Sequence, residues 1–376
     1  MKSTSKNMNY ILNYEKLEVG DIILEAGHKV HSKAIQTYTK SNFSHAMVCL
    51  DNTSIIHSEG DGTFTLNPQR LLVKNKNDLK VLRIKEGLSD ELKKELTLFL
   101  RIQVGSLYSV KDALLTLTYS QTEKESSSQY QFCSRLVAQA YDSINYQLVK
   151  NKDFCSPEDI NRSEILVEVE DMIRKTNSTD TKFALKRNFV LENQKSTYDW
   201  LNKTRDYASD TYNFEIHIQN DVDKFLWKHK EADNIVCEYI KASGYLENYK
   251  ISIKNNPHMY DKDIFINKFK KLEEKEEYII NMIIGEFKKE PSLIIRFLKN
   301  YTNSINNFNN TKLQYYQLQI NLYKNLLSDI MSRLITLHEV YMDYIQKNLI
   351  DNHKIIVNLH HYLQVLKDNG IEKYKF

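Results

Sequence analysis

Glycine and proline are both scarce in this chain of 376 residues, which has nine glycines and four prolines. These two residue types mark most turns and loops. Six of the nine glycines, at positions 20, 27, 60, 62, 87 and 105, come before residue 106. We therefore expect turn-rich structure early in the chain and mostly helical structure after it.

The sequence also has no long apolar run. No segment approaches the roughly 18 apolar residues that a membrane-spanning helix needs, so we expect no transmembrane segment. The start, Met1 to Asn7, is basic but has no apolar stretch and no small-residue cleavage site. This pattern excludes a secretory signal and favours a cytoplasmic protein. A role outside the cell would need export by a specialised secretion system.

An excess of charge of one sign is missing too. The 52 lysines and arginines nearly balance the 49 aspartates and glutamates, which gives a formal net charge of +3. Such a surface gives no electrostatic reason to expect nucleic acid as a partner.

Cysteine is rare and scattered. The four cysteines form neither a CxxC pair nor a metal-ligand spacing; they are Cys49, Cys133, Cys155 and Cys237. We expect reduced thiols, as in cytosolic proteins, and neither a metal nor a cofactor.

The N-terminal half has the pattern of a small, mostly antiparallel sheet. Apolar runs bounded by turn residues indicate strands. These runs are Val19 to Leu24, Phe43 to Leu50, Thr53 to Glu59, Thr63 to Leu66 and Leu79 to Ile84. The second and third are separated by Asp51-Asn52, which predicts a β-hairpin.

The hairpin register decides whether two histidines can act together. A regular two-residue loop at Asp51-Asn52 would pair His45 with Ser58 and place His57 on the other face, because side chains alternate along a strand. For His45 and His57 to share a face, the loop must have an odd length or a bulge must shift the register. We predict one of these.

Cys133 is expected at the start of a helix. A polar, serine-rich loop precedes it, and apolar residues recur with helical spacing after it, at Leu136, Val137, Ala140 and Tyr141. Unpaired N–H groups at a helix N-terminus favour a thiolate, so the pKa of Cys133 should be lowered. The alternative is that Cys133 is a buried small hydrophobic residue.

The chain changes character after about residue 171. We expect a domain over residues 1–172, a linker over 173–185 and an all-helical domain over 186–376. From Leu313 to Tyr344 apolar residues repeat as heptad positions, which predicts one helix of roughly 50 Å. Its apolar stripe is wide, which favours packing within its own bundle over a dimer seam.

The N-terminal half supplies one candidate for each part of a cysteine hydrolase. Such an enzyme needs a nucleophilic thiolate, a general base, a group that orients the base and donors for the oxyanion. Cys133 would be the nucleophile, His45 the base and His57 the orienting residue. The backbone N–H of Cys133 and the Tyr108 hydroxyl are the oxyanion candidates.

Six short motifs occur in a set order along the N-terminal half. They are Gly20-Asp21-Ile22-Ile23, Ser44-His45-Ala46-Met47-Val48, Ile55-Ile56-His57-Ser58, Gly105 with Tyr108, Phe132-Cys133-Ser134-Arg135-Leu136-Val137 and Cys155-Ser156-Pro157-Glu158-Asp159. This order resembles the permuted papain-like cysteine amidases of the NlpC superfamily, in the YiiX/YebB-like branch. In that branch the histidine strand precedes the cysteine helix, the reverse of the ordinary papain order, and the resemblance covers roughly residues 18–165.

The resemblance implies an α+β fold: a permuted papain-like domain with a small antiparallel sheet packed on helices, followed here by the helical domain. It implies Cys133 and His45 as catalytic residues. For the third position, His57 is preferred and Glu59, on the same face of a regular strand, is the alternative. The preference would reverse if Glu59 rather than His57 lay within about 2.6 to 3.2 Å of His45.

Three functions follow. The first is hydrolysis of an amide bond in a peptide, cell-wall-type or isopeptide substrate through a Cys133 thioester. The second, on the same fold, is a lipid ester or thioester hydrolase or an acyltransferase, which a deep apolar groove beside Cys133 would favour. The third is an inactive scaffold whose helical half binds a partner protein.

Overall fold

The structure of the protein is a computed structural model that describes residues 9–27, 42–51, 53–60, 62–120, 122, 126, 130–269, 275–345 and 353–373. The chain divides into two compact units, Met1–Phe225 and Leu226–Phe376. Each unit is described by itself.

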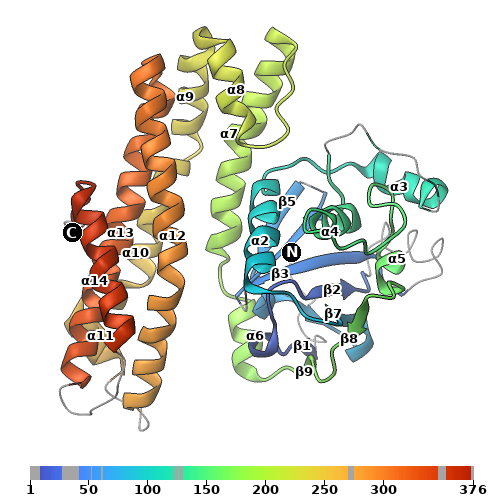
Figure 1. Ribbon diagram of the computed structural model, residues 1–376, viewed down its shortest axis with the longest axis horizontal. Helices are drawn as coiled ribbons and strands as arrows, with labels where there is room; N and C mark the ends of the chain where they lie inside the picture. Colours follow the sequence, from blue (N-terminus) through green and yellow to red (C-terminus); the bar gives the residue numbers. More distant parts are fainter. Residues whose placement is uncertain are drawn as a thin grey trace. The chain divides into compact units, whose positions relative to one another are not determined.

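The first unit is built on the expected antiparallel sheet, which has six strands in the order β5-β4-β3-β2-β7-β8 (Figure 1). The strands are β2 (Ile22–Glu25), β3 (His45–Asp51), β4 (Ser54–Glu59), β5 (Gly62–Leu66), β7 (Leu79–Ile84) and β8 (Leu166–Glu168). Each neighbouring pair is antiparallel. A second, three-stranded sheet contains β6 (Leu72–Val73), β1 (Tyr10–Leu12) and β9 (Ile173–Lys175) in that order.

Side-chain alternation along β3 gives the large sheet two buried faces. Met47 and Cys49 point into a cluster with Leu12 of β1. Ala46 and Val48 point the other way, into the cluster formed with the helices. Because both faces are covered, the strand reads as a continuous apolar run.

Among the described residues, seven α-helices begin in the first unit. They are α2 (Asp90–Gln103), α3 (Val110–Tyr119), α4 (Cys133–Asp142), α5 (Pro157–Asn161), α6 (Ser178–Ala184), α7 (Phe189–Tyr212) and α8 (Asp221–Lys228). Leu136, Val137 and Ala140 of α4 are fully buried or nearly so and pack on the sheet. The predicted apolar face of the Cys133 helix is confirmed.

The segment expected to be a linker, 173–185, is structured within the first unit. β9 pairs with β1, and Asn177 and Asp180 form a capping box at the start of α6. Arg174 binds Asp180 through two hydrogen bonds of 2.6 and 2.9 Å. We expected a linker because this segment lacks apolar periodicity. The segment is held by polar contacts instead, and these leave no periodic pattern in the sequence. The compact units divide later than the expected limits, and the limit at residue 172 stays a prediction.

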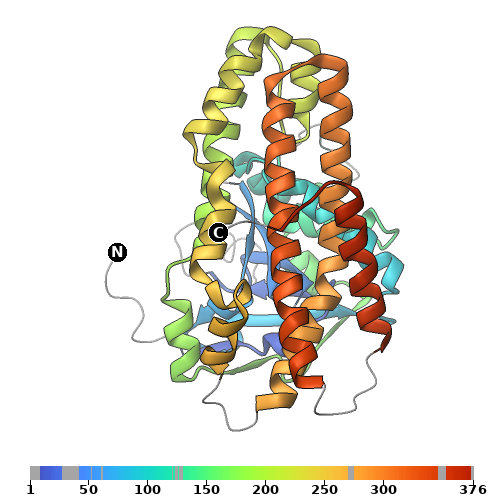
Figure 2. The same cartoon turned by 90° about the vertical axis from the view of Figure 1, so that its left-hand side faces the viewer.

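The second unit is helical, as expected. Its helices are α9 (Asp233–Ala242), α10 (Asn248–Asn255), α11 (Lys262–Phe269), α12 (Lys275–Thr311), α13 (Gln314–Ile345) and α14 (His353–Asp368). α13 is the predicted heptad helix. Its Leu327, Leu334 and Leu337 are buried in one cluster with Ile283 of α12 and Leu366 of α14. α12 and α13 lie side by side (Figures 1 and 2).

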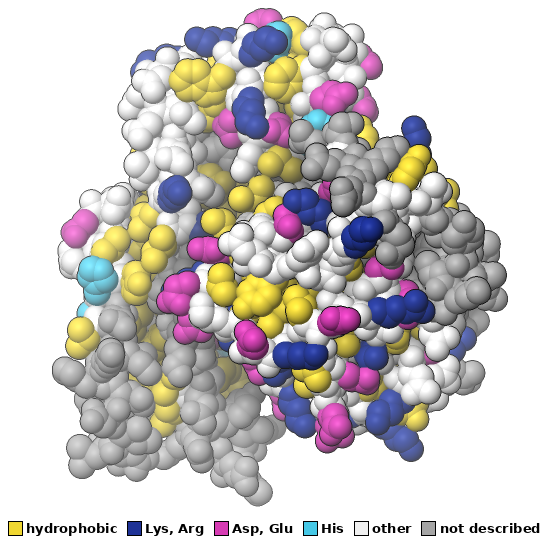
Figure 3. Space-filling view, turned by 45° about the vertical axis from the view of Figure 1, so that its right-hand side comes forward, with side chains coloured by type: hydrophobic (Ala, Val, Ile, Leu, Met, Phe, Trp, Pro, Cys, Tyr) yellow, Lys and Arg dark blue, Asp and Glu magenta, His cyan; other side chains and the backbone are white. Residues whose placement is uncertain are grey.

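Two further observations concern the whole chain. No helix in the described ranges is both long and apolar enough to cross a membrane. The described surface in Figure 3 carries lysine and arginine side chains interspersed with aspartate and glutamate, in keeping with the small net charge.

Candidate active site

The β3–β4 hairpin has the predicted irregularity. Met47 lies opposite His57 and Cys49 lies opposite Ile55, but the register shifts between Cys49 and Asp51. Because of this shift, His45 and His57 lie on the same face of the hairpin. Their rings meet at 90° with centroids 5.1 Å apart, and His45 Nε2 is 2.9 Å from His57 Nδ1.

Cys133 is the first residue of α4. Phe132 precedes it in an extended conformation, with φ −142° and ψ 166°, and caps the helix without a side-chain hydrogen bond. The Cys133 sulfur receives a hydrogen bond from the backbone N–H of Ala46, the residue after His45. The start of β3 and the start of α4 therefore meet at the sulfur.

The thiol of Cys133 is buried, with 5% of the residue exposed. Burial raises its pKa, and the charge of Glu59 adds to the increase, although hydrogen bonds from Ala46 and Ser134 act in the opposite direction. Our expectation of a lowered pKa is wrong. A helix terminus is worth at most about 2 kcal/mol to a charge, whereas complete burial of an ionisable group shifts its pKa by up to several units.

Tyr108 reaches the same place from another segment. A parallel bridge joins Tyr108 to Gln131: the Gln131 N–H donates to the Leu107 carbonyl, and the Ser109 N–H donates to the Gln131 carbonyl, both at 2.8 Å. The pKa of Tyr108 is raised by burial first and then by the charges of Cys133 and Glu59. The phenol thus keeps its proton and is a hydrogen-bond donor near the sulfur.

The choice between His57 and Glu59 depends on their positions along β4. His57 Nδ1 lies 2.9 Å from His45 Nε2, within the hydrogen-bond range of about 2.6 to 3.2 Å. The carboxylate of Glu59 acts electrostatically on Cys133 and Tyr108. The geometry favours His57 as the orienting residue. The Cys133 sulfur lies at the backbone of Ala46, the residue after His45, and it interacts electrostatically with Glu59 and Tyr108.

An aromatic row behind His57 was missed from the sequence. The Phe64 ring of β5 lies 6.4 Å from the His57 ring and 4.7 Å from the Tyr198 ring of α7. The Tyr198 hydroxyl donates to the Thr63 carbonyl at 2.8 Å. The buried residues of α7, among them Tyr198 and Leu201, recur with helical spacing. This spacing is the sequence signal that could have shown a packed helix here.

Helix α4 is fixed by a second residue that sequence reasoning missed, the fully buried Arg135. Its Nη1 donates to Asp112 Oδ2 at 2.9 Å and to the Tyr130 carbonyl at 2.8 Å, and its Nε donates to the Asp153 carbonyl at 2.8 Å. The guanidinium also lies 4.6 Å from the centre of the Phe132 ring. Arg135 thus ties the first turn of α4 to three neighbouring segments.

Among the residues that the structure describes, no group of three or more histidine, cysteine, aspartate or glutamate side chains could hold a metal ion. The candidate groups described above are a thiol, two imidazoles, a carboxylate and a phenol.

Comparison with known proteins finds one family match, over the part of the chain that holds these residues. Residues 16–182 match the family described as permuted papain-like amidase enzyme, YaeF/YiiX, C92 family. No curated protein matches the chain. Among solved structures, the chain is similar to metalloprotein yiiX from Escherichia coli O157:H7, at 19% identity over 40% of this chain and 96% of that chain, with a TM-score of 0.29. The N-terminal part of the chain, residues 16–182, is thus a permuted papain-like domain of the C92 family, a family of amidases.

Proposed function

We propose that the chain is a cysteine-dependent amide hydrolase in which Cys133 is the nucleophile, His45 the general base and His57 the residue that orients His45. The observation that carries the proposal is the 2.9 Å contact between His45 and His57 at the start of β3. The next residue of that strand, Ala46, donates its backbone N–H to the Cys133 sulfur. The sulfur and the imidazole pair therefore belong to one local structure.

The protonation state of Cys133 sets the first step. Because burial raises its pKa, the resting thiol is neutral. His45 Nδ1 takes the thiol proton as the sulfur attacks the amide carbon, since His45 Nε2 is held by His57. The negative charge that develops on the carbonyl oxygen is stabilised by the Cys133 N–H and the Tyr108 hydroxyl.

The second half of the cycle returns the proton. The tetrahedral intermediate collapses, the C–N bond breaks and the imidazolium of His45 gives its proton to the leaving amine. Water, activated by the neutral His45, then attacks the thioester. The carboxylic acid leaves and the Cys133 thiol is restored.

The groups around Cys133 favour a polar substrate. Glu59 and Tyr108 act electrostatically at the sulfur, and a carboxylate and a phenol there suit a peptide-like amide better than an acyl chain. We therefore propose a peptide or isopeptide bond as the substrate class. Hydrolysis of a lipid ester or thioester is the alternative on the same machinery.

The proposal is tested by treating the full chain with an electrophilic acyl probe and measuring intact mass. We expect one adduct, which peptide mapping places on Cys133, and we expect its loss in Cys133→Ala and His45→Ala. Thermal unfolding of both variants serves as the folding control. Equal labelling of the other three buried cysteines, or labelling that survives His45→Ala, would favour the inactive scaffold.

A further inference from the structure

Helix α7 lies outside the part of the chain that matches the family, residues 16–182, but its buried Tyr198 reaches the segment that leads to Tyr108. The Tyr198 hydroxyl lies between two backbone carbonyls, 2.8 Å from the Thr63 oxygen and 3.4 Å from the Ser106 oxygen. A phenol has one O–H, which two neighbouring acceptors can share. This hydroxyl therefore joins strand β5 to the residues just before Tyr108.

The two segments that Tyr198 joins are also bound to each other. The Thr63 N–H donates to the Ser106 carbonyl at 3.0 Å, and the Gly105 N–H donates to the Thr63 carbonyl at 3.2 Å. A side chain at Gly62, whose φ is +135°, would clash with the Tyr198 hydroxyl and with the Ser106 carbonyl oxygen. The hydroxyl is thus closely packed against both segments, which leaves the backbone of Ser106 little room to move.

A second residue of α7 holds the same segment. Tyr198 and Arg205 are seven residues apart, which places them two turns apart on one face of the helix. Arg205 Nη2 donates to the Gly105 carbonyl at 2.5 Å. One face of α7 therefore binds the two residues that begin the segment, Gly105 and Ser106.

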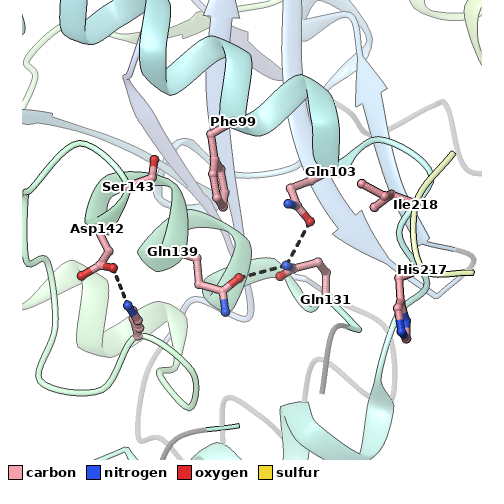
Figure 4. Close-up of a pocket in the computed structure, with 9 residues that line it drawn as sticks. Phe99, Gln103, Gln131, Gln139, Asp142, Ser143, His217 and Ile218 are labelled. Atoms are coloured by element: carbon pink, nitrogen blue, oxygen red, sulfur yellow. Dashed lines mark hydrogen bonds and ion pairs between the residues drawn. The ribbon is translucent and has the colours of Figure 1, made fainter. Parts of the chain in front are cut away.

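The other side of the segment is held by Gln131, two residues before Cys133. The backbone of Gln131 bonds to the residues on both sides of Tyr108. Its side-chain Nε2 donates to Gln103 Oε1 at 3.2 Å and to Gln139 Oε1 at 2.9 Å (Figure 4). Tyr108 thus lies between an anchor close to the nucleophile and the anchor that α7 supplies.

We propose that Tyr198 is a positioning residue for the hydrolysis proposed above, on which this inference rests. It fixes the backbone of Ser106, two residues before Tyr108, and so sets where the Tyr108 hydroxyl meets the developing oxyanion. Donors to an oxyanion have to be held in a fixed place, and a misplacement of about 1 Å can cost ~100-fold in rate.

The test compares two reagents on the full chain. With p-nitrophenyl acetate, the Cys133 sulfur attacks the ester carbonyl, its proton passes to His45, an oxyanion forms and nitrophenolate leaves. Iodoacetamide alkylates the same sulfur by displacement of iodide, and no oxyanion forms. Loss of an oxyanion donor therefore slows only the acetylation, whereas a disturbed fold or a changed thiol pKa alters both rates.

Tyr198→Phe keeps the ring that packs on Phe64 and removes only the hydroxyl. We expect it to slow Cys133 acetylation by ~10-fold, against ~100-fold for Tyr108→Phe, with the alkylation rate unchanged in both variants. Because Tyr198 acts through Tyr108, the double variant should be no slower than Tyr108→Phe alone. The matched control is Trp200→Phe, at a fully buried position on another face of α7, which should leave both rates unchanged.

The rates are measured as nitrophenolate release in excess of Cys133→Ala and as intact mass after alkylation, and thermal unfolding checks the fold of each variant. Acetylation that falls in Tyr108→Phe but not in Tyr198→Phe would overturn this inference and leave the proposed hydrolysis standing. Equal slowing of acetylation and alkylation in Tyr198→Phe would also overturn it, because Tyr198 would then support only the fold. A wild-type chain that is not acetylated at Cys133 would overturn the proposed function, and this inference with it.

Discussion

At the scale of single residues, Cys133 combines a position that favours a thiolate with surroundings that oppose one. It begins α4, where backbone N–H groups are unpaired, and it accepts hydrogen bonds from Ala46 and Ser134. Burial and the nearby Glu59 outweigh these interactions and raise the pKa. The thiol therefore depends on His45 for activation at the moment of attack, which distinguishes it from a preformed thiolate.

The first prediction is a pH profile. Because the pKa of Cys133 is raised in the folded chain, its thiolate fraction at neutral pH is below that of an ordinary thiol, whose pKa is about 8.5. We therefore expect the rate at which iodoacetamide alkylates Cys133 in the folded protein to keep rising as the pH passes about 8.5. Mass spectrometry measures this rate. A rate that is already constant below neutral pH would mean that the pKa is lowered instead.

The second prediction separates His57 from Glu59. His57→Ala removes the group 2.9 Å from His45 and should slow acyl-probe labelling of Cys133 by ~100-fold or more. Glu59→Gln removes a negative charge that disfavours the thiolate, so it should change the rate only a few-fold, and upward. The reverse ranking of the two variants would make Glu59 the orienting residue.

At the scale of elements, α4 is placed by contacts on both of its flanks. Leu136, Val137 and Ala140 pack on the sheet, and Arg135 binds segments that precede and follow the helix. A buried guanidinium held by several acceptors can only be accommodated in one geometry, so Arg135 determines where the helix begins relative to its neighbours.

The third prediction concerns this arginine. Arg135→Leu leaves the buried acceptors around it without their charged donor, and it should lower the free energy of unfolding by ~3 to 5 kcal/mol, measured by urea denaturation. The matched control is Arg162→Leu. Arg162 pairs with Glu158 on the surface, with its side chain 69% exposed, and its loss should cost less than ~1 kcal/mol. Similar costs for the two variants would contradict the structural role given to Arg135.

At the scale of the whole molecule, the first compact unit extends past the family match at residue 182 to Phe225. Helix α7 joins it through Gln194, which bonds both the N–H and the carbonyl of Thr65 on edge strand β5, at 2.6 and 2.9 Å. Arg205 of the same helix donates to the Gly105 and Ile216 carbonyls. The strand next to that of His57 and the segment that leads to Tyr108 are thus held partly from outside the matched region.

The fourth prediction follows from this packing. A chain that ends after Phe225 should fold, unfold cooperatively and retain acyl-probe labelling of Cys133. A chain that ends after Leu185 loses α7, which covers β5, and should lose both properties. Circular dichroism melting and intact mass measure the two outcomes. Labelling of Cys133 at the full rate in the shorter chain would show that α7 is dispensable. Comparing the longer truncation with the full chain then measures any contribution of the helical unit.

Much of the architecture followed from local patterns. The apolar runs of the strands, Cys133 at the start of a helix and the heptad helix α13 are all patterns that are visible over a short window of sequence. From the sequence, His45 and His57 could share a face only if the hairpin had an odd loop length or a bulge. The register of β3 and β4 does shift between Cys49 and Asp51.

The sequence by itself determined the order of the elements and which residue types are available for chemistry. Only the tertiary structure decided the direction of the Cys133 pKa shift, the reach of His57 to His45, the place of α7 in the first unit and the contact of Tyr198 with the Ser106 backbone. The physical reason is that burial and hydrogen-bond partnership depend on residues far apart in the chain, which no local period records.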